Sequence, residues 1–346
     1  MALSTRRRRQ VVMLLRFIAI GSLAGALYGL AVDSSLGGDS ARLGFLRGLI
    51  TGAMVTLAIA IFEIFYANGP SGQGLRRLPF MRVALIKTVL YSFFIVSLDG
   101  LGNILVPIEG ADPTGFNSAT LITLAAALGF TFVVNTLMQI NLLLGRRVLK
   151  NFIKGRYHHP RLEQRLFLFL DMRGSTAIAE RIGDIAFHKL LNQFFSDLGE
   201  AVEDHEGGIE KYVGDEMIVT WPLPLNDGRA VATVFAARDL LRRRADFYRE
   251  RLGAVPDFRA VLHAGPVVVG EMGDFKREIA LLGDTINTTA KIEQWAKGVE
   301  HTVVVSRAAL DAMGPLAGVK ALPLGAQLLP GKAQPLELFA LESEQK

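Results

Sequence analysis

The chain has 346 residues, of which half are hydrophobic, and its mean hydropathy is +0.32. It is longer than one average domain and more apolar than a simple soluble protein, so membrane-spanning segments are expected. The sequence has no Cys, which excludes disulfides, thiolate metal ligands and cysteine nucleophiles. The net charge of +5 could suggest nucleic acid as a partner, but the basic residues gather beside apolar segments, so we expect a lipid bilayer and no nucleic acid.

Four apolar segments in the first half are each long enough for the roughly 20 residues that cross a bilayer. They lie at about 11–32, 46–67, 83–106 and 119–144. Basic residues precede the first segment, occupy the second loop and follow the fourth segment, whereas the third loop, around Glu109 and Asp112, has none. The positive-inside rule therefore predicts a multi-pass inner (plasma) membrane protein with its N-terminus and second half in the cytoplasm. Arg42 and Arg47, in and after the first external loop, depart from this rule.

Polar residues inside the apolar segments raise the possibility of a transport path. They are Glu63, Asp99, Asn135 and Gln139. Glu63 and Asp99 lie near segment ends, so we expect interface or helix–helix contacts, and a transporter is the less favoured alternative. We divide the chain into a transmembrane anchor at 1–145, a basic connector at 146–164 and a cytoplasmic domain at 165–346. The connector is short enough to couple the last segment mechanically to the domain.

The second half predicts an α/β (α+β) domain. The run at 166–170 is typical of a strand buried on both faces, and it ends at Asp171. Helices are expected at 177–181 and 185–205, with Ser175 or Thr176 as N-cap. Two strands at 209–213 and 217–221 then form a hairpin with Gly214 and Asp215 at its tip.

The later elements complete the fold. They are a long helix at 229–251, strands at 258–263, 267–271 and near 276–282, a helix to 296 capped by Asp284 or Thr285, and strands at 303–305, 322–324 and 336–341. The order βαββαβ with a central hairpin predicts a ferredoxin-like core with additions.

This core predicts that Asp171 and Asp215 meet at one end of the sheet, because the first strand and the hairpin are central neighbours. Two adjacent carboxylates repel each other unless cations lie between them. Such a pair is typical of a two-metal site for phosphoryl or nucleotidyl transfer, where Mg²⁺ accepts oxygen ligands from protein and substrate phosphates.

Four motifs in the second half resemble class III adenylyl/guanylyl cyclases. They are FLDMRGST from Phe169, KYVGDEMIV from Lys211, LHAGPVVVGEMG from Leu262 and LLGDTINTTAKIE from Leu281. They extend from Leu166 to about Leu341 in the family's order and spacing, and the four-segment anchor is similar to that of bacterial membrane-bound members.

The resemblance implies that a nucleoside triphosphate is converted to a 3′,5′-cyclic monophosphate and pyrophosphate, in sites shared by two catalytic domains. Asp171 and Asp215 match the family's metal ligands, with help from the backbone of Met172, and would hold two Mg²⁺ or Mn²⁺ ions per site. Lys211 matches the residue that reads adenine, so the implied reaction is ATP to cyclic AMP. The usual partner of that lysine is replaced by Ala280, which cannot hydrogen-bond through its side chain.

Three further positions match catalytic or binding residues of the family. Asn287 matches the residue that orients the ribose and the transition state. Lys291 stands where the family usually has Arg, which makes a slower enzyme or a different phosphate pose the expectation. Lys332 matches a late phosphate-binding Lys, or is a surface residue. His263, on an apolar strand, is expected to be a core histidine and not a catalytic one.

The two halves of one implied site come from different subunits, so a homodimer through catalytic domain and anchor is expected. A guanylate cyclase is the nearest alternative; Ala280 favours this alternative, whereas Lys211 favours an adenylate cyclase. A diguanylate cyclase shares the hairpin but leaves the helix around Asn287 unexplained. A catalytically weak nucleotide-binding sensor module is the alternative of a different class, motivated by Ala280 and Lys291 together.

Overall fold

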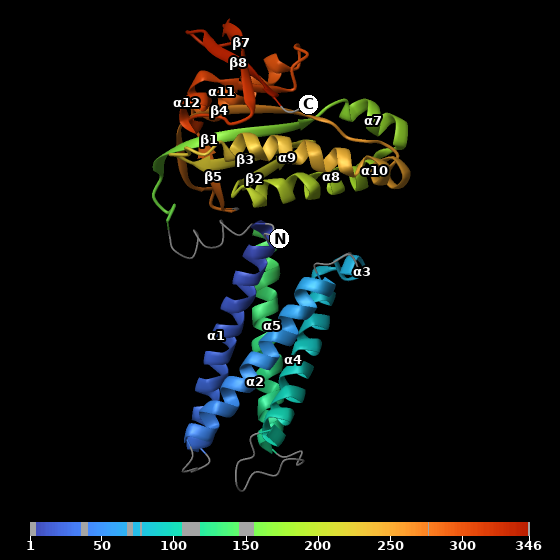
Figure 1. The fold of residues 1–346 in the computed structure, drawn as a ribbon, viewed down its shortest axis with the longest axis vertical. Helices are drawn as coiled ribbons and strands as arrows, with labels where there is room; N and C mark the ends of the chain where they lie inside the picture. The colour runs from blue at the N-terminus through green and yellow to red at the C-terminus, as the bar shows by residue number, and fades with distance from the viewer. Residues whose placement is uncertain are drawn as a thin grey trace. The chain divides into compact units, whose positions relative to one another are not determined.

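The structure is a computed structural model. It describes residues 5–35, 41–67, 72–76, 78–105, 118–144, 156–275 and 277–344. The chain divides into two compact units, Met1–Arg146 and Arg147–Lys346 (Figure 1). The predicted connector at 146–164 lies partly outside the described residues, which resume at Arg156.

The first unit is helical. Its elements are α1 (Thr5–Ser35), α2 (Ala41–Ile61), a π-helical turn η1 (Phe62–Ala67), α3 (Gln73–Arg76), α4 (Phe80–Leu105) and α5 (Ser118–Leu144). Within its described residues, three helices are long and apolar enough to cross a membrane, over Leu14–Ala31, Arg42–Ile61 and Phe80–Gly102. The apolar stretch described in α5 is the shorter Ala127–Leu137, so the fourth span stays a prediction.

Glycines let α1 and α2 approach at backbone distance. A Cβ on Gly25 of α1 would lie 2.2 Å from the carbonyl oxygen of Gly48 of α2, and a Cβ on Gly48 would lie 2.0 Å from the carbonyl oxygen of Gly25. Any larger residue at either position would separate the helices. Small residues serve this purpose where helices pack within lipid, because close backbone packing replaces the hydrophobic driving force available in water.

Polar side chains inside this unit contact other helices. Glu63 in η1 accepts hydrogen bonds from Lys87 Nζ at 2.5 Å and from the hydroxyl of Tyr91, both on α4. Ser92 Oγ and Thr131 Oγ1 lie 3.1 Å apart and join α4 to α5. These contacts agree with the expectation that Glu63 makes helix–helix contacts.

The second unit contains one mixed eight-stranded sheet. Its strands are β1 (Arg161–Met172), β2 (Gly208–Val213), β3 (Glu216–Pro222), β4 (Phe258–Met272), β5 (Glu278–Leu282), β6 (Val303–Ser306), β7 (Val319–Gln327) and β8 (Leu336–Ser343). The strand order is β2-β3-β1-β4-β6-β8-β7, with β5 paired to β4. The β2-β3-β1-β4 portion has antiparallel β1–β3 and β1–β4 pairs, and confirms the predicted ferredoxin-like core.

Helices cover the sheet and divide its side chains into two apolar clusters. They are α7 (Ser175–Ile182), α8 (Asp184–Asp204), α9 (Arg229–Arg243), α10 (Ala245–Leu252), α11 (Asp284–Ala296) and α12 (Arg307–Met313). Leu166, Leu168 and Leu170 of β1 pack with residues of α8 and α9, whereas Phe167 and Phe169 pack with residues of α11. We call the second side the α11 face. The all-apolar run of β1 is thus buried on both sides, as predicted.

Two predicted boundaries are wrong in this unit. The stretch at 258–271 is one continuous strand, β4, with Gly265 and Pro266 inside it. The helix at 229–251 is divided at Arg244 into α9 and α10. The side chain of Arg244 contacts the buried carboxylate of Asp197 on α8, so the break coincides with a fixed ion pair between helices.

The predicted helix caps are also wrong. Gly174, with a φ of 65°, is the N-cap of α7, and Gly283 is the N-cap of α11; neither helix has a side-chain cap. The hydroxyl of Thr285 donates to the carbonyl oxygen of Pro266 at 2.6 Å, and the carboxylate of Asp284 accepts from Lys332 at 2.5 Å. Asp284 also accepts from the hydroxyl of Thr288 within α11 at 3.3 Å, and neither candidate side chain accepts from a backbone N–H at the start of the helix.

Candidate active site

Asp171 lies near the end of β1, directly opposite Glu216 of β3. Side chains alternate along a strand, so Leu170 and Met172 point into the cluster below α8 and α9, and Asp171 shares the α11 face with Phe169. Its side chain is buried, with 8% of the residue exposed. Burial raises the pKa of Asp171, and the nearby ammonium of Lys297 opposes that rise.

Asp215 lies at the tip of the β2–β3 hairpin. Gly214 takes a φ of 62°, the left-handed conformation that a two-residue turn requires, and Val213 pairs with Glu216 to close the turn. Burial is the largest cause of the raised pKa values of Asp171 and Glu216, and the charge of Asp215 adds a smaller rise to both. The hairpin tip and the end of β1 therefore lie within electrostatic reach of each other.

Two more carboxylates and a lysine lie at this position. Glu293, on α11, contributes to the raised pKa of Asp171, and burial followed by the charge of Glu293 raises the pKa of Glu216 to about 8. Lys297 Nζ lies 3.2 Å from Asp171 Oδ2 and 2.7 Å from Glu293 Oε1. We name Asp171, Asp215, Glu216 and Glu293 the acidic corner. Glu216, Glu293 and Lys297 were not predicted as site residues; the spacing of Glu293 and Lys297 by about one helical turn is the sequence signal that could have indicated them.

The donor set of the acidic corner fits a hard divalent cation. All its donors are carboxylate oxygens, and the ammonium of Lys297 between Asp171 and Glu293 indicates that the corner attracts positive charge. No group of three or more acidic or histidine side chains in the described part of the chain has the geometry of a complete metal site. Further ligands would come from backbone or substrate phosphates. Met172 buries its side chain in the core, so only its backbone could serve.

A second group of polar residues gathers at the start of α11. Asn287 is exposed on its first turns, and Lys291 lies one turn further along. The ammonium of Lys291 would be 3.1 Å from a Cβ on Gly331, beside Lys332 in the β7–β8 loop. Both Lys332 and Lys291 lower the pKa of Asp284, with Lys332 bonded to it directly. We name Asn287, Lys291 and Lys332 the basic group. It provides two ammonium groups and one side-chain amide.

Lys211 and Ala280 lie on other strands. Lys211 is exposed on the edge strand β2, and Ala280 is half-buried on β5 opposite Gly270 of β4. Among the described residues, no hydrogen bond or ion pair joins Lys211 or the basic group to the acidic corner of the same chain. The roles assigned to these residues from the resemblance stay predictions.

His263 has the structural role that was expected. It is 7% exposed, and its Nδ1 lies 2.8 Å from the hydroxyl of Ser306. Burial, with the nearby positive charge of Lys332, lowers the pKa of His263 to about 4. The imidazole is therefore neutral at physiological pH.

Comparisons with known proteins agree with this fold. The family model for the adenylate and guanylate cyclase catalytic domain matches residues 158–342, just over half of the chain. Adenylate cyclase 2 of Rhizobium meliloti is 34% identical over 64% of this chain and 62% of its own length. Guanylyl cyclase C of Rattus norvegicus is 29% identical over 44% of this chain and 15% of its own length.

A solved structure of a bacterial light-regulated adenylyl cyclase is similar in fold, with a TM-score of 0.53 and 18% identity, over 67% of each chain. The matched residues 158–342 contain β1 to β7, all but the last residue of β8, the acidic corner and the basic group. The chain therefore belongs to the family of adenylate and guanylate cyclase catalytic domains.

Proposed function

We propose that this protein is a membrane-bound adenylate cyclase that converts ATP to 3′,5′-cyclic AMP and pyrophosphate for intracellular signalling. The observation that carries the proposal is the position of Asp171 near the end of β1 and of Asp215 at the tip of the β2–β3 hairpin, at one corner of a ferredoxin-like sheet in which β3 pairs with β1. The similarity to adenylate cyclase 2 of Rhizobium meliloti supports ATP as the substrate.

In the proposed reaction, the ribose 3′-hydroxyl of ATP loses its proton to water and its oxygen forms a bond to the α-phosphorus. The bond from that phosphorus to the pyrophosphate oxygen breaks, and pyrophosphate leaves. Asp171, Asp215 and the backbone of Met172 would hold two Mg²⁺ or Mn²⁺ ions. Such ions lower the pKa of a bound hydroxyl and neutralise charge on phosphates. The buried position of Asp171 limits its hydration and strengthens its electrostatic interaction with a cation.

The other site residues bind and orient the nucleotide. Lys211 donates a hydrogen bond to the adenine ring, and Asn287 orients the ribose. Lys291 and Lys332 neutralise phosphate oxygens; their shared proximity to Asp284 supports a common phosphate position. A Lys in place of Arg supplies a point charge without bidentate hydrogen bonding, which favours slower turnover.

We further propose a homodimer in which each active site takes its acidic corner from one subunit and Lys211 with the basic group from the other. The exposed position of Lys211 and Asn287, away from contacts with the acidic corner of their own chain, supports this arrangement. The apolar helices of residues 1–145 anchor the dimer, with the N-terminus and catalytic domain in the cytoplasm. The basic connector at 146–164 would transmit the anchor's state to the domain at 165–346.

The direct test is the formation of cyclic AMP from ATP by membranes that contain the full chain, with Mg²⁺ or Mn²⁺. Asp171→Asn and Asp215→Asn should each lower the rate at least about 100-fold, because metal binding contributes several kcal/mol. Asp246→Asn, which changes an exposed carboxylate on α10, is the matched control and should keep wild-type activity. Wild-type rates in Asp171→Asn or Asp215→Asn would refute the metal assignment.

A mixing experiment tests the shared site. Asp215→Ala and Lys211→Ala should each be inactive alone, and their co-expression should partly restore activity because one site of each heterodimer is then intact. No restoration would contradict the two-subunit arrangement. Comparison of the full chain with residues 155–346, dimerised artificially, tests the role of the anchor: equal activity under every condition tried would leave it unsupported.

A guanylate cyclase is the second candidate. Ala280 favours it, since its side chain cannot help Lys211 to recognise adenine, and one relative is named guanylyl cyclase C. Side-by-side assays with ATP and GTP decide between the two. A nucleotide-binding sensor module, argued from Ala280 and Lys291 together, would bind nucleotide and form no cyclic product.

A further inference from the structure

Strand β2 contains an irregularity next to Lys211. Ile209 pairs with Val219 of β3, but Lys211 pairs with the adjacent residue Ile218, so Glu210 is an extra residue in β2. This is a β-bulge, which places two residues of one strand opposite one residue of its partner. Bulges redirect the side chains that follow them, because the alternation of faces restarts after the extra residue.

The bulge decides on which face of the sheet Lys211 lies. Ile218, its partner, packs with Phe167 and Phe169 on the α11 face. In a regular ladder from Ile209 onward, Lys211 would instead oppose Met217, which belongs to the cluster beneath α8 and α9. Lys211 therefore shares the face of Asp171 because Glu210 is bulged.

The next residue supports this reading of the register. Tyr212 pairs with Met217, and its ring centroid lies 4.6 Å from that of Phe195 on α8. Tyr212 is therefore on the opposite side of the sheet from the α11 face. A shift of β2 by one residue would exchange the positions of Lys211 and Tyr212.

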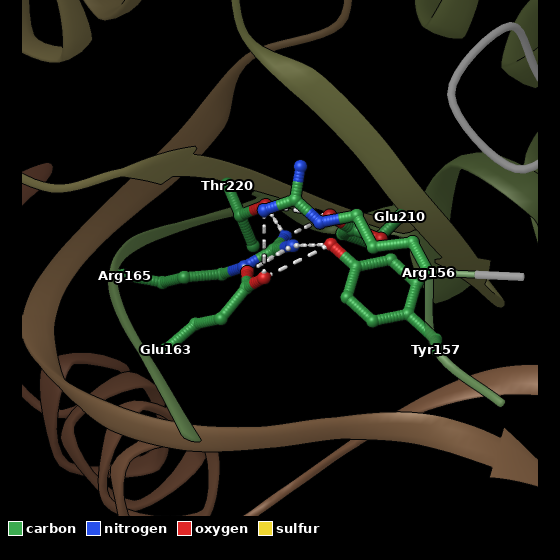
Figure 2. Close-up of polar contacts among 6 residues, drawn as sticks. All are labelled: Arg156, Tyr157, Glu163, Arg165, Glu210 and Thr220. Atoms are coloured by element: carbon green, nitrogen blue, oxygen red, sulfur yellow. Dashed lines mark hydrogen bonds and ion pairs between the residues drawn. The ribbon is translucent and has the colours of Figure 1, made fainter. Parts of the chain in front are cut away.

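The side chain of Glu210 is held by two partners, Thr220 on the adjacent strand β3 and Arg165 on β1, the strand beyond it (Figure 2). Glu210 Oε1 accepts hydrogen bonds from Thr220 Oγ1 at 2.6 Å and from Arg165 Nη1 at 2.7 Å. Arg165 Nη1 also donates to Thr220 Oγ1 at 2.9 Å. These three residues form a closed triangle over β1, β2 and β3, which we call the bulge clamp.

The guanidinium of Arg165 also contacts the segment where the chain enters the catalytic domain (Figure 2). Its Nε and Nη2 donate to Glu163 Oε2 at 3.1 Å and 2.9 Å, and Nη2 lies 3.3 Å from the hydroxyl of Tyr157. Tyr157 in turn donates to Glu163 Oε1 at 3.1 Å. Arg165 is 7% exposed, so these contacts replace the water that its charge would otherwise bind.

We propose that Arg165 and Glu210 are positioning residues that set the choice of nucleotide base by holding Lys211 on the α11 face. The inference rests on the proposed function, in which Lys211 reads the base. Neither residue contacts substrate itself. A charge-assisted, multidentate contact suits this role, since its geometry is more restrictive than that of a single neutral hydrogen bond.

The test uses the full chain in detergent and two readouts. The first is competition of ATP and of GTP against a fluorescent nucleotide analogue with Ca²⁺ present, which gives the ratio of the two affinities without turnover. The second is KM and kcat for both nucleotides. Glu210→Ala should lower the ATP preference about tenfold, mostly through KM, since a misplacement of about 1 Å can cost up to about 100-fold. Glu210→Gln keeps an acceptor oxygen and should restore most of the preference.

A double mutant with Lys211→Ala distinguishes a positioning role of Glu210 from a general effect of its loss on the structure. In the Lys211→Ala background, which is expected to be inactive, the competition assay is the readout. There Glu210→Ala should produce no further change in the ratio of the ATP and GTP affinities, because the residue being positioned is absent. Asp246→Asn, on the surface of α10, is the matched control. Unfolding temperatures are measured for all variants, and Thr220→Val provides a milder change to the bulge clamp if Glu210→Ala fails to fold.

Several outcomes would overturn the inference. These are an unchanged ATP-to-GTP ratio in Glu210→Ala and Thr220→Val, a further fall in the Lys211→Ala background, or the absence of any nucleotide binding. If the wild-type chain binds nucleotide but forms no cyclic product, the proposed function fails, whereas the affinity ratios still decide the role of the bulge clamp.

Discussion

Lys297 is predicted to compete with the divalent cation at the acidic corner. Its ammonium lies 3.2 Å from Asp171 Oδ2 and 2.7 Å from Glu293 Oε1, where it neutralises charge that a metal ion would otherwise neutralise. A cation that binds Asp171 must displace this ammonium or bind against its repulsion. Lys297→Met, which keeps the length of the side chain and removes its charge, should therefore increase affinity for Mn²⁺.

The distance sets the size of the effect. At 3.2 Å, two unit charges interact by about 1.3 kcal/mol at the dielectric constant of water and by about 5 kcal/mol at an effective value of about 20. Half of the Lys297 side chain is exposed, so solvent screening favours the lower figure. About 1.4 kcal/mol corresponds to a tenfold change in a binding constant. We expect the dissociation constant for Mn²⁺ to fall about tenfold in Lys297→Met.

Mn²⁺ binding to the purified full chain can be followed directly by electron paramagnetic resonance of the free ion, and the metal dependence of cyclic nucleotide formation gives a second value. Lys297→Arg keeps the charge and should resemble the wild type. Lys320→Met removes an exposed lysine on β7 and controls for the loss of one positive charge. Equal or weaker Mn²⁺ binding in Lys297→Met would refute the reasoning, because the ammonium would then support the site instead of competing for it.

Three further changes have defined outcomes. The pKa of His263 is lowered to about 4, below its value of about 6.5 in an unfolded chain. The contribution of this residue to the free energy of unfolding should therefore be fully present above pH 6.5 and fall by about 3 kcal/mol as the pH drops to 4. Urea unfolding at pH 7 and pH 4.5 should show a smaller loss in His263→Gln than in the wild type. Asp197 is 2% exposed and accepts a hydrogen bond from Tyr248 Oη at 2.8 Å, so Asp197→Ala should lower the free energy of unfolding by about 3 kcal/mol, measured by the same method. Ala280→Asp should raise the preference for ATP over GTP by providing Lys211 with a carboxylate partner, and an unchanged ratio in competition assays would contradict that pairing.

Much of the fold could be predicted because its strongest signals are local. The apolar run that becomes β1 and the Gly214–Asp215 turn each need only a few adjacent residues. The continuity of β4 through Pro266 could not be predicted from the local sequence, because it depends on which strands pair with β4 on each side. The β6 ladder ends at Leu262 and the β5 ladder begins at Val268, so Pro266 lies where β4 has a neighbour on one side only. A proline, which lacks an N–H, is tolerated in a strand at such an unpaired edge.

The acidic corner was only half predictable for a similar reason. Asp171 and Asp215 each follow a recognisable strand or turn, and the order of elements brings them together. Glu293 on α11 and Lys297 at the C-cap of that helix lie more than a hundred residues beyond Asp171 in the chain, and they come close to it only because α11 packs over the same face of the sheet. No periodicity within α11 specifies which strand end it will meet.

Lys211 shows what the sequence could not predict: its position in the motif is clear from the sequence, but the face of the sheet on which it lies is not. Counting back from Asp215 identifies it, yet strict alternation from Ile209 would place it toward α8. The deciding residue is Glu210, the bulged residue of β2, and its partners Thr220 and Arg165 come from two other strands. A motif can therefore supply the expected residue type at the expected spacing, while contacts with other strands determine on which face of the sheet that residue lies.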